Sequence, residues 1–236
     1  MKKVLILLST MLLALSCSKM PDVPVVDLAK LTADYEARDG ETLTGILGGN
    51  YKITISGGMV TALGGPSAAG IGSGYHAKCG NISISGGSVT SRGGEFAAGI
   101  GGGSGTDIDE DVDTETPSVC GNITISGGTV MASGNSILSA AGIGSGEGNA
   151  TCGDILISGG TVTAEGEHEA AGIGTGARGS VGSITVTNGV TQVTVKKVSD
   201  STPHSIGGGL DYKKLGTVTI GGKEGPVSES PFVYKP

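Results

Sequence analysis

Apolar and polar residues alternate in short runs that recur along most of the chain. The motif isoleucine–x–isoleucine, or a variant with one valine, begins at Ile53, Ile82, Ile123, Ile155, Ile184 and Val218. Successive starts are 29, 41, 32, 29 and 34 residues apart. Alternation over such short runs is typical of a half-buried β-strand. A period of this length is typical of a stacked repeat architecture.

One unit of the repeat predicts three short strands separated by turns. In the unit that starts at Cys120, a run over 123–125 is followed by two glycines, a second run over 129–132 and a third over 140–144. No helical period fits, because glycine is unfavourable inside a helix. The inward side chains are expected to be Ile123, Ile125, Val130, Ala132 and Ile143, matched in the next unit by Ile155, Ile157, Val162, Ala164 and Ile173.

A single unit does not bury enough to fold alone. About five apolar side chains contribute roughly 1.5–3 kcal/mol each when they are large. Ordering the backbone costs roughly 1–2 kcal/mol for every residue of the unit. Stacked units share strand pairing and can fold, so the sequence predicts an all-β fold. The predicted architecture is a right-handed parallel β-helix (β-solenoid) of about six coils with an N-terminal cap.

The composition along the chain divides it into five parts. They are a signal peptide (1–16), a lipidated cysteine with a tether (17–26), an N-terminal capping segment (27–49), the repeats (50–225) and a C-terminal capping tail (226–236). Terminal repeats are expected to be atypical. The tail carries Pro226, Pro231 and Pro236, and proline blunts an exposed sheet edge because it cannot donate to a ladder.

The N-terminus predicts an exported, anchored protein. Two lysines precede an apolar run over 4–15 that is too short for a spanning helix. The run ends Ala14-Leu-Ser-Cys17, which resembles the lipobox of bacterial lipoproteins. We therefore expect Cys17 to carry lipid and to attach the protein to the outer membrane, with the body facing either the periplasm or the exterior. A plain secretory signal is the alternative.

The repeat motifs resemble a known group of proteins. CGNITISGG, TVTA and AAGIGSG, together with the closing SPFVYKP, are similar to the glycine-rich repeat lipoproteins of Gram-negative gut anaerobes. The resemblance covers almost the whole chain after the leader. It implies a β-helical, adhesin-like or carbohydrate-binding lipoprotein, and it implies no catalytic residues.

The charge balance argues against nucleic acid as a partner. The chain has 15 basic and 22 acidic residues and a net charge of −7. Nucleic-acid binding needs a basic surface. With 46 glycines but no strict triplet, the 236-residue chain is also not collagen-like.

Three cysteines occupy the same position in successive units, namely Cys79, Cys120 and Cys152. In a solenoid they would stack about 4.8 Å apart, within the Cα range of a disulfide. One neighbouring pair could bridge, or all three could form a ladder of small buried groups. A zinc site is disfavoured, because no histidine keeps a fixed offset from them (His76, His168 and His204).

An acidic insertion lengthens the second unit. Its alternating carboxylates are weak candidates for calcium, which prefers oxygen ligands (Asp107, Asp109, Asp111 and Asp113). The helix–loop–helix calcium signature fails at Val112 and Ser118. A solvated loop is therefore the favoured interpretation. No other cofactor is expected.

Outward positions of the predicted strands are mostly hydroxyl residues. The first-strand row is Thr54, Ser83, Thr124, Leu156, Thr185 and Thr219. The second strand adds Met59, Thr61, Ser88, Thr90, Thr129, Met131, Thr161 and Thr163. Threonine rows on a flat face resemble ice-binding surfaces, but Met59, Met131 and Leu156 interrupt them, and threonine is a common exposed strand residue.

Few residues suggest catalysis. Glycoside hydrolysis needs two carboxyl groups roughly 5–9.5 Å apart, and the nearest candidate is a turn with Glu165, Glu167, His168 and Glu169. We therefore expect no enzyme, and favour a non-catalytic binding or adhesion module for a glycan. Aromatic platforms for sugars are scarce in the repeats (Tyr51, Tyr75 and Phe96). A structural spacer without a specific ligand is the alternative, followed by a pectate-lyase-like enzyme.

Overall fold

The computed structural model describes residues 25–27, 35–37, 42–44, 52–106, 116–134 and 139–236. Regular structure in this part of the chain is entirely β, in 24 strands. Within these residues, no helix is long and apolar enough to span a bilayer.

Each coil follows the same path. The first coil contains β4 (Ile53–Ile55), β5 (Met59–Leu63), β6 (Ile71–Gly72) and β7 (Lys78–Cys79). The second contains β8 (Ile82–Ile84), β9 (Ser88–Arg92), β10 (Ile100–Gly101) and β11 (Ser118–Cys120). Two glycines separate the first strand from the second, and Gly58 and Gly87 lie at φ 86° and 85°, where a side chain would be strained.

In the third and fourth coils the first two strands form one continuous strand. These coils contain β12 (Ile123–Ser133), β13 (Ile143–Gly144) and β14 (Ala150–Cys152), then β15 (Ile155–Gly166), β16 (Ile173–Gly174) and β17 (Ser180–Val181). The fifth contains β18 (Ile184–Val186), β19 (Gln192–Lys197), β20 (Ile206–Gly207) and β21 (Lys214–Leu215).

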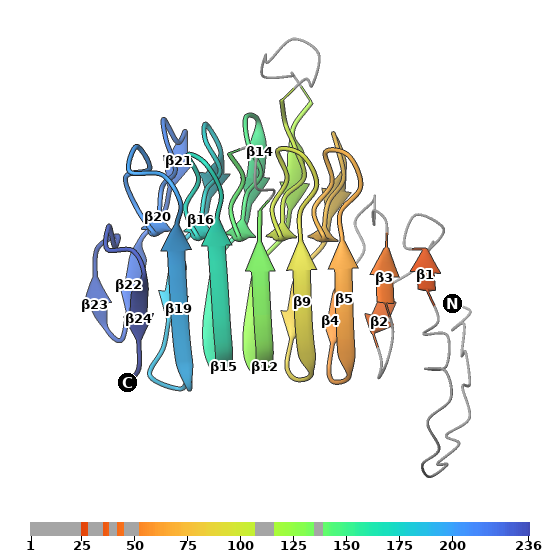
Figure 1. Cartoon of the computed structure of the whole chain (residues 1–236), viewed down its shortest axis with the longest axis horizontal. Helices are drawn as coiled ribbons and strands as arrows, with labels where there is room; N and C mark the ends of the chain where they lie inside the picture. Colours follow the sequence, from red (N-terminus) through yellow and green to blue (C-terminus); the bar gives the residue numbers. More distant parts are fainter. Residues whose placement is uncertain (1–24, 28–34, 38–41, 45–51, 107–115, 135–138) are drawn as a thin grey trace.

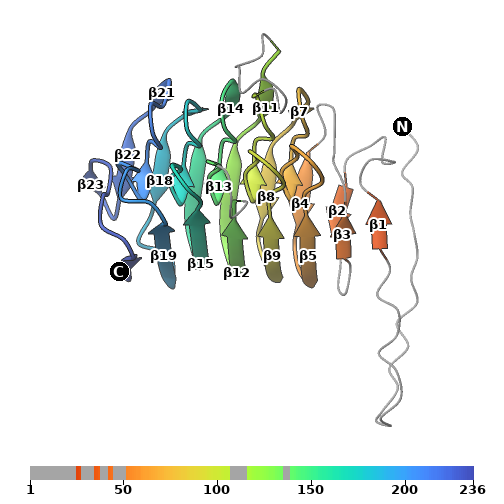
Figure 2. The ribbon, with the colours of Figure 1, turned by 45° about the horizontal axis from the view of Figure 1, so that its top comes forward.

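Equivalent strands of successive coils pair in parallel and in register. The front ladder, β5–β9–β12–β15–β19, runs side by side across the molecule (Figure 1). A second ladder joins β6, β10, β13, β16 and β20, and a third joins β7, β11, β14, β17 and β21 along the top of Figure 2. The prediction of an all-β parallel β-helix is confirmed, and the coil is consistent with the predicted right hand.

The solenoid has five complete coils and the first strand of a sixth. β22 (Val218–Ile220) adds to β18 in parallel, as the repeat predicts. The chain then reverses, and β23 (Lys223–Glu224) pairs antiparallel with β22. β24 (Phe232–Tyr234) runs antiparallel along β19. The tail therefore lies on the last rung instead of completing another coil.

At the other end, short strands extend the sheet beyond the first coil. β1 (Val25–Asp27) pairs with β3 (Thr42–Thr44), which pairs with β5. β2 (Tyr35–Ala37) pairs with β4. The described residues of the segment expected to be a cap are thus strands in register with the first coil.

The core is a set of straight rows of aliphatic side chains. The inward set of the third coil is fully buried, with Ala132 the most exposed at 4%. The matching set of the fourth coil is at most 1% exposed. The prediction of both sets is therefore confirmed. Rows of Ile, Val and Ala along the axis form one continuous hydrophobic core.

At the AAGIG motif, the backbones of neighbouring coils approach each other closely. The last glycine of the four AAGIG copies (Gly72, Gly101, Gly144 and Gly174) and the equivalent Gly207 of the fifth coil have φ between 134° and 146°. A Cβ on Gly144 would lie 1.8 Å from the carbonyl oxygen of Gly174 in the next coil. These glycines allow neighbouring backbones to approach closely, so their role is in packing.

Candidate binding site

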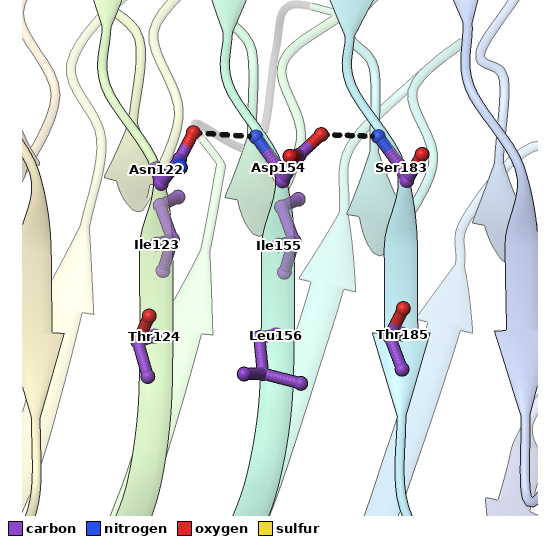
Figure 3. A pocket seen from close by; sticks show the side chains of 8 residues that line it. All are labelled: Asn122, Ile123, Thr124, Asp154, Ile155, Leu156, Ser183 and Thr185. Atoms are coloured by element: carbon purple, nitrogen blue, oxygen red, sulfur yellow. Dashed lines mark hydrogen bonds between the residues drawn. The ribbon is translucent and has the colours of Figure 1, made fainter.

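A row of polar side chains precedes the first strand of successive coils. The backbone N–H of Asn122 donates to Asn81 Oδ1 (2.9 Å), and that of Asp154 donates to Asn122 Oδ1 (2.9 Å). Ser183 N–H then donates to Asp154 Oδ1 at 2.8 Å (Figure 3). We call Asn81, Asn122, Asp154 and Ser183 the polar row. Each acceptor satisfies a donor of the following coil, so the row fixes the register at this corner.

The glycine before each member of this row makes room for the ladder. A Cβ on Gly121 would lie 2.5 Å from Asn81 Oδ1, and one on Gly153 would lie 2.2 Å from Asn122 Oδ1. This explains the repeated Cys-Gly-Asn/Asp motif. Asp154, which stands out in the sequence as a charged variant, is a regular member of the ladder.

Beside the polar row, the outward side chains of the first strands line a shallow groove of about 310 Å³. Thr124, Leu156 and Thr185 lie in line on three neighbouring strands (Figure 3). Their strands pair in register, Thr124 with Leu156 and Leu156 with Thr185. The groove therefore runs along the axis of the solenoid, and Leu156, 37% exposed, lies at its centre. We call this surface the axial groove.

The axial groove presents open hydrogen-bonding atoms. The ladder uses one oxygen each of Asn122 and Asp154. Within the described part of the chain, Asn122 Nδ2 and Asp154 Oδ2 have no further hydrogen-bond partner. The groove thus offers an amide donor, a carboxylate acceptor and several hydroxyls around one exposed aliphatic side chain.

The front ladder carries a different outward surface. One row consists of Thr61, Thr90, Met131, Thr163 and Thr194. The row beside it consists of Leu63, Arg92, Ser133, Glu165 and Lys196. Met59, Leu63 and Met131 are 66%, 52% and 53% exposed. This face therefore mixes apolar groups with charges of both signs, and methionine interrupts its threonine row.

In the acidic turn expected as the nearest catalytic candidate, Glu165 and Glu167 interact, and His168 and Glu169 have further neighbours of their own. Burial, followed by the charge of Glu165, raises the pKa of Glu167, while Arg92 acts in the opposite direction. His168 Nδ1 instead lies 3.3 Å from Ser139 Oγ. Glu169 lines a separate cavity of about 200 Å³. The four residues have different surroundings, as expected for a turn.

That second cavity contains an ion pair that sequence reasoning missed. Arg178 Nη2 lies 3.0 Å from Glu147 Oε1, and the N–H of Ser139 donates to Glu147 Oε2 at 3.3 Å. Glu147 is 7% exposed, so its charge is compensated inside the protein. The partners are separated by one coil, and the irregular loop lengths hide this relation in the sequence. The pair ties neighbouring turns together.

The three repeated cysteines lie on adjacent rungs of the third ladder. Cys79 pairs in register with Cys120, and Cys120 with Cys152. All are buried, and no disulfide joins them. A hydrogen bond with Cys120 and then burial raise the pKa of the Cys79 thiol, and a hydrogen bond with Cys152 raises that of Cys120. Protonated, buried thiols are poorly reactive, which supports a packing role.

The remaining candidate sites fall outside the described residues. These are Cys17 and the acidic insertion with Asp107, Asp109, Asp111 and Asp113. At the end of that insertion, Ser118 Oγ lies within hydrogen-bond distance of the carbonyl oxygens of Ser104 and Gly74, and its hydroxyl proton can be donated to either. Elsewhere in the described chain, no group of three or more potential metal-ligating side chains lies together.

Comparison with known proteins supports the repeat architecture. Residues 53–75, 82–104, 123–147 and 155–177 match a family model described as Beta helix repeat. Each match begins at the first strand of one of the first four coils. No curated protein and no solved structure matches the chain. Together with the ladders of strands, the match shows that the chain is a β-helical repeat protein.

Proposed function

We propose that this protein is a non-catalytic binding or adhesion module whose ligand is a glycan lying along a flat face of the solenoid. The observation that carries the proposal is the axial groove, where open polar atoms surround an exposed leucine. Ligand sites commonly combine apolar contact with a few polar groups that set orientation. Sugars present both C–H surfaces and hydroxyls, so they fit this combination.

The charges in the groove favour binding over hydrolysis. General acid–base cleavage of a glycoside uses two carboxyl groups roughly 5–9.5 Å apart. Asp154 is the single carboxylate among the eight residues that line the groove. Its Oδ1 also accepts a backbone hydrogen bond. The pectate-lyase-like alternative therefore has less support than a binding role.

A structural spacer or coat component is the second candidate. It is favoured by the outward rows of the two strand faces, which in coils one to five hold mainly Thr and Ser, with some Met, Leu and charged side chains and no aromatic residue. Such rows need no ligand, because threonine is a good exposed strand residue. The spacer also agrees with five coils that stack in register along one axis.

The proposal includes attachment of this module to a membrane. The sequence around Cys17 and the resemblance to adhesin-like lipoproteins support a lipid anchor in the outer membrane, with the body in the periplasm or at the cell surface. Cys17→Ala should move the protein from the membrane fraction to the soluble fraction. Unchanged fractionation with membranes would contradict lipidation at this residue.

A glycan array tests the binding function directly. The Cys17→Ala chain is applied with calcium and with a chelator, beside a heat-unfolded sample as control. We expect saturable binding to at least one class of glycan by the folded chain alone. If no glycan binds in either condition, the spacer becomes the preferred function. Binding only in calcium would assign a role to the acidic insertion.

A further inference from the structure

We infer that the axial groove binds an unbranched, uncharged polysaccharide whose chain runs parallel to the solenoid axis across at least three coils. This inference rests on the proposed glycan-binding function. It specifies the face, the direction and the class of the ligand.

The direction follows from how the groove is built. Its lining residues come from equivalent positions of the third, fourth and fifth coils. Parallel rungs are spaced about 4.8 Å apart, so an extended chain along the axis meets similar groups at regular intervals. A chain lying across the axis would contact one rung and leave the others unused. An unbranched polymer is therefore the matching shape.

The hydrogen-bonding groups match sugar hydroxyls. Asn122 offers N–H donors at one rung, Asp154 offers an acceptor at the next, and Ser183 offers a hydroxyl that can do both. The backbone ladder holds the first two side chains in place, because Oδ1 of each accepts a backbone N–H of the following coil. A hydroxyl both donates and accepts, so one kind of ligand group satisfies all three positions.

Leu156 supplies the apolar part of the site. In its row the equivalent residues are hydroxyl-bearing, namely Thr54, Ser83, Thr124, Thr185 and Thr219. Leu156 replaces threonine at the centre of the groove and stays 37% exposed. Covering its side chain with the C–H face of a sugar ring removes apolar surface from water. Threonine at this position would offer less of that surface.

Charge selects the class of glycan. Asp154 is the only charged residue among those that line the groove, and the whole chain carries a net charge of −7. A uronate or sulfate within a few ångströms of this carboxylate is repelled. An acidic polymer should therefore bind about tenfold more weakly than a neutral one of the same length. The front ladder carries the basic residues Arg92 and Lys196 in the same row as Glu165, so the same repulsion of acidic polymers is not expected there.

The test uses the Cys17→Ala chain and calorimetric titration with cellohexaose, mannohexaose, xylohexaose and hexagalacturonic acid. At least one neutral hexamer should bind, and more tightly than its trimer. Leu156→Thr, which completes the threonine row, should weaken binding about fivefold to tenfold. Met131→Thr makes a matched change on the front ladder and should leave binding unchanged. All variants should melt like the parent chain.

Asp154→Asn removes the negative charge of the groove and keeps the side-chain oxygen that accepts the ladder hydrogen bond. Asn122 already makes the same backbone contact one coil earlier, so the variant keeps the fold and should gain affinity for hexagalacturonic acid. Tighter binding of the acidic hexamer by the parent chain would overturn the inference, as would a loss of binding in Met131→Thr but not in Leu156→Thr. In both cases glycan binding itself would stand. If no glycan binds, neutral or acidic, the proposed function fails as well.

Discussion

The inward and outward rows of the same strands behave differently. Ile123, Ile155 and Ile184 are identical and at most 1% exposed. On the adjacent outward positions, Thr124 and Thr185 flank a leucine. The inward row repeats because each side chain is enclosed by neighbours on every side. The outward row tolerates substitution, so packing does not explain the leucine in a row of threonines, and the proposed ligand, which contacts this surface, does.

The difference follows from packing. A buried side chain in a dense interior loses many contacts when its volume or polarity changes. An outward side chain contacts only its two ladder neighbours and solvent, and most such substitutions change stability little. Stability should therefore depend on the inward rows and glycines, and recognition on the outward rows.

The largest effect is expected from a charge in the inward row. Ile125 is fully buried, so Ile125→Asp places an unpaired carboxylate in the core, which costs several kcal/mol. The purified variant should be unfolded at room temperature by circular dichroism. Thr124→Ser, one residue away on the outward row, is the control and should melt like the parent. An unchanged melting curve for Ile125→Asp would refute the assigned inward face.

A single methyl group at the closely packed glycines of the AAGIG motif should have the next largest effect. Gly144 has φ 138°, and an added Cβ would meet the Gly174 carbonyl. Gly144→Ala should lower the free energy of unfolding by at least about 2 kcal/mol. Gly57→Ala is the matched control, because nothing lies within 4 Å of the added carbon. Denaturant unfolding of both variants measures the contrast, and equal stabilities would contradict close packing at Gly144.

Breaking the polar row should have a smaller effect. Asp154→Ala removes the acceptor of the Ser183 N–H and should cost about 0.5–1.5 kcal/mol, since water can partly replace an exposed acceptor. Asp154→Asn keeps the acceptor and should stay within about 0.5 kcal/mol of the parent. Thermal unfolding distinguishes the two. If alanine and asparagine were equivalent, the ladder would contribute nothing to stability.

The smallest effect concerns pH. Burial, followed by the charge of Glu165, raises the pKa of Glu167 above its ordinary value. A carboxyl whose pKa is raised on folding favours the folded state below its unfolded pKa, and this contribution disappears as pH rises through the folded value. The parent should therefore lose slightly more stability than Glu167→Gln between pH 4 and neutrality, measured as melting temperature. Parallel pH profiles would show that the turn does not perturb Glu167.

The fold could be predicted from the sequence because two periods occur in the same residues: an alternation of apolar and polar positions, and a repeat of about 29 residues. Alternation identifies the strands, and the spacing of about 29 residues identifies the coil. The number of coils was overestimated, since Val218–Ile220 has the same pattern as a true first strand. The reversal that follows depends on Gly221 and Gly222 at φ 56° and 81° and on antiparallel pairing of the tail. The hydrophobic pattern contains no sign of this pairing.

The candidate site was only partly predictable. The outward row was identified, but the groove depends on three coils brought side by side and on side chains that bond across rungs. The ladder hydrogen bonds of Asn122 and Asp154 join residues 41, 32 and 29 positions apart, and these unequal separations obscure the relation in the sequence. The recurring Cys-Gly-Asn/Asp motif was the available signal. Lipidation at Cys17 stays a prediction, as does the solvated acidic loop, for which calcium binding is the weaker alternative.

The most direct test of the central claim is an NMR titration of the isotope-labelled Cys17→Ala chain with a neutral hexasaccharide that it binds. The account predicts saturable shifts of the backbone amides of Thr124, Leu156 and Thr185, which follow one line across three coils, and of Asp154 in the polar row beside them. The amides of Thr161 and Thr163 on the front ladder should not move. Shifts confined to the front ladder, or spread without relation to the groove, would contradict the claim that the outward first-strand row is the recognition surface.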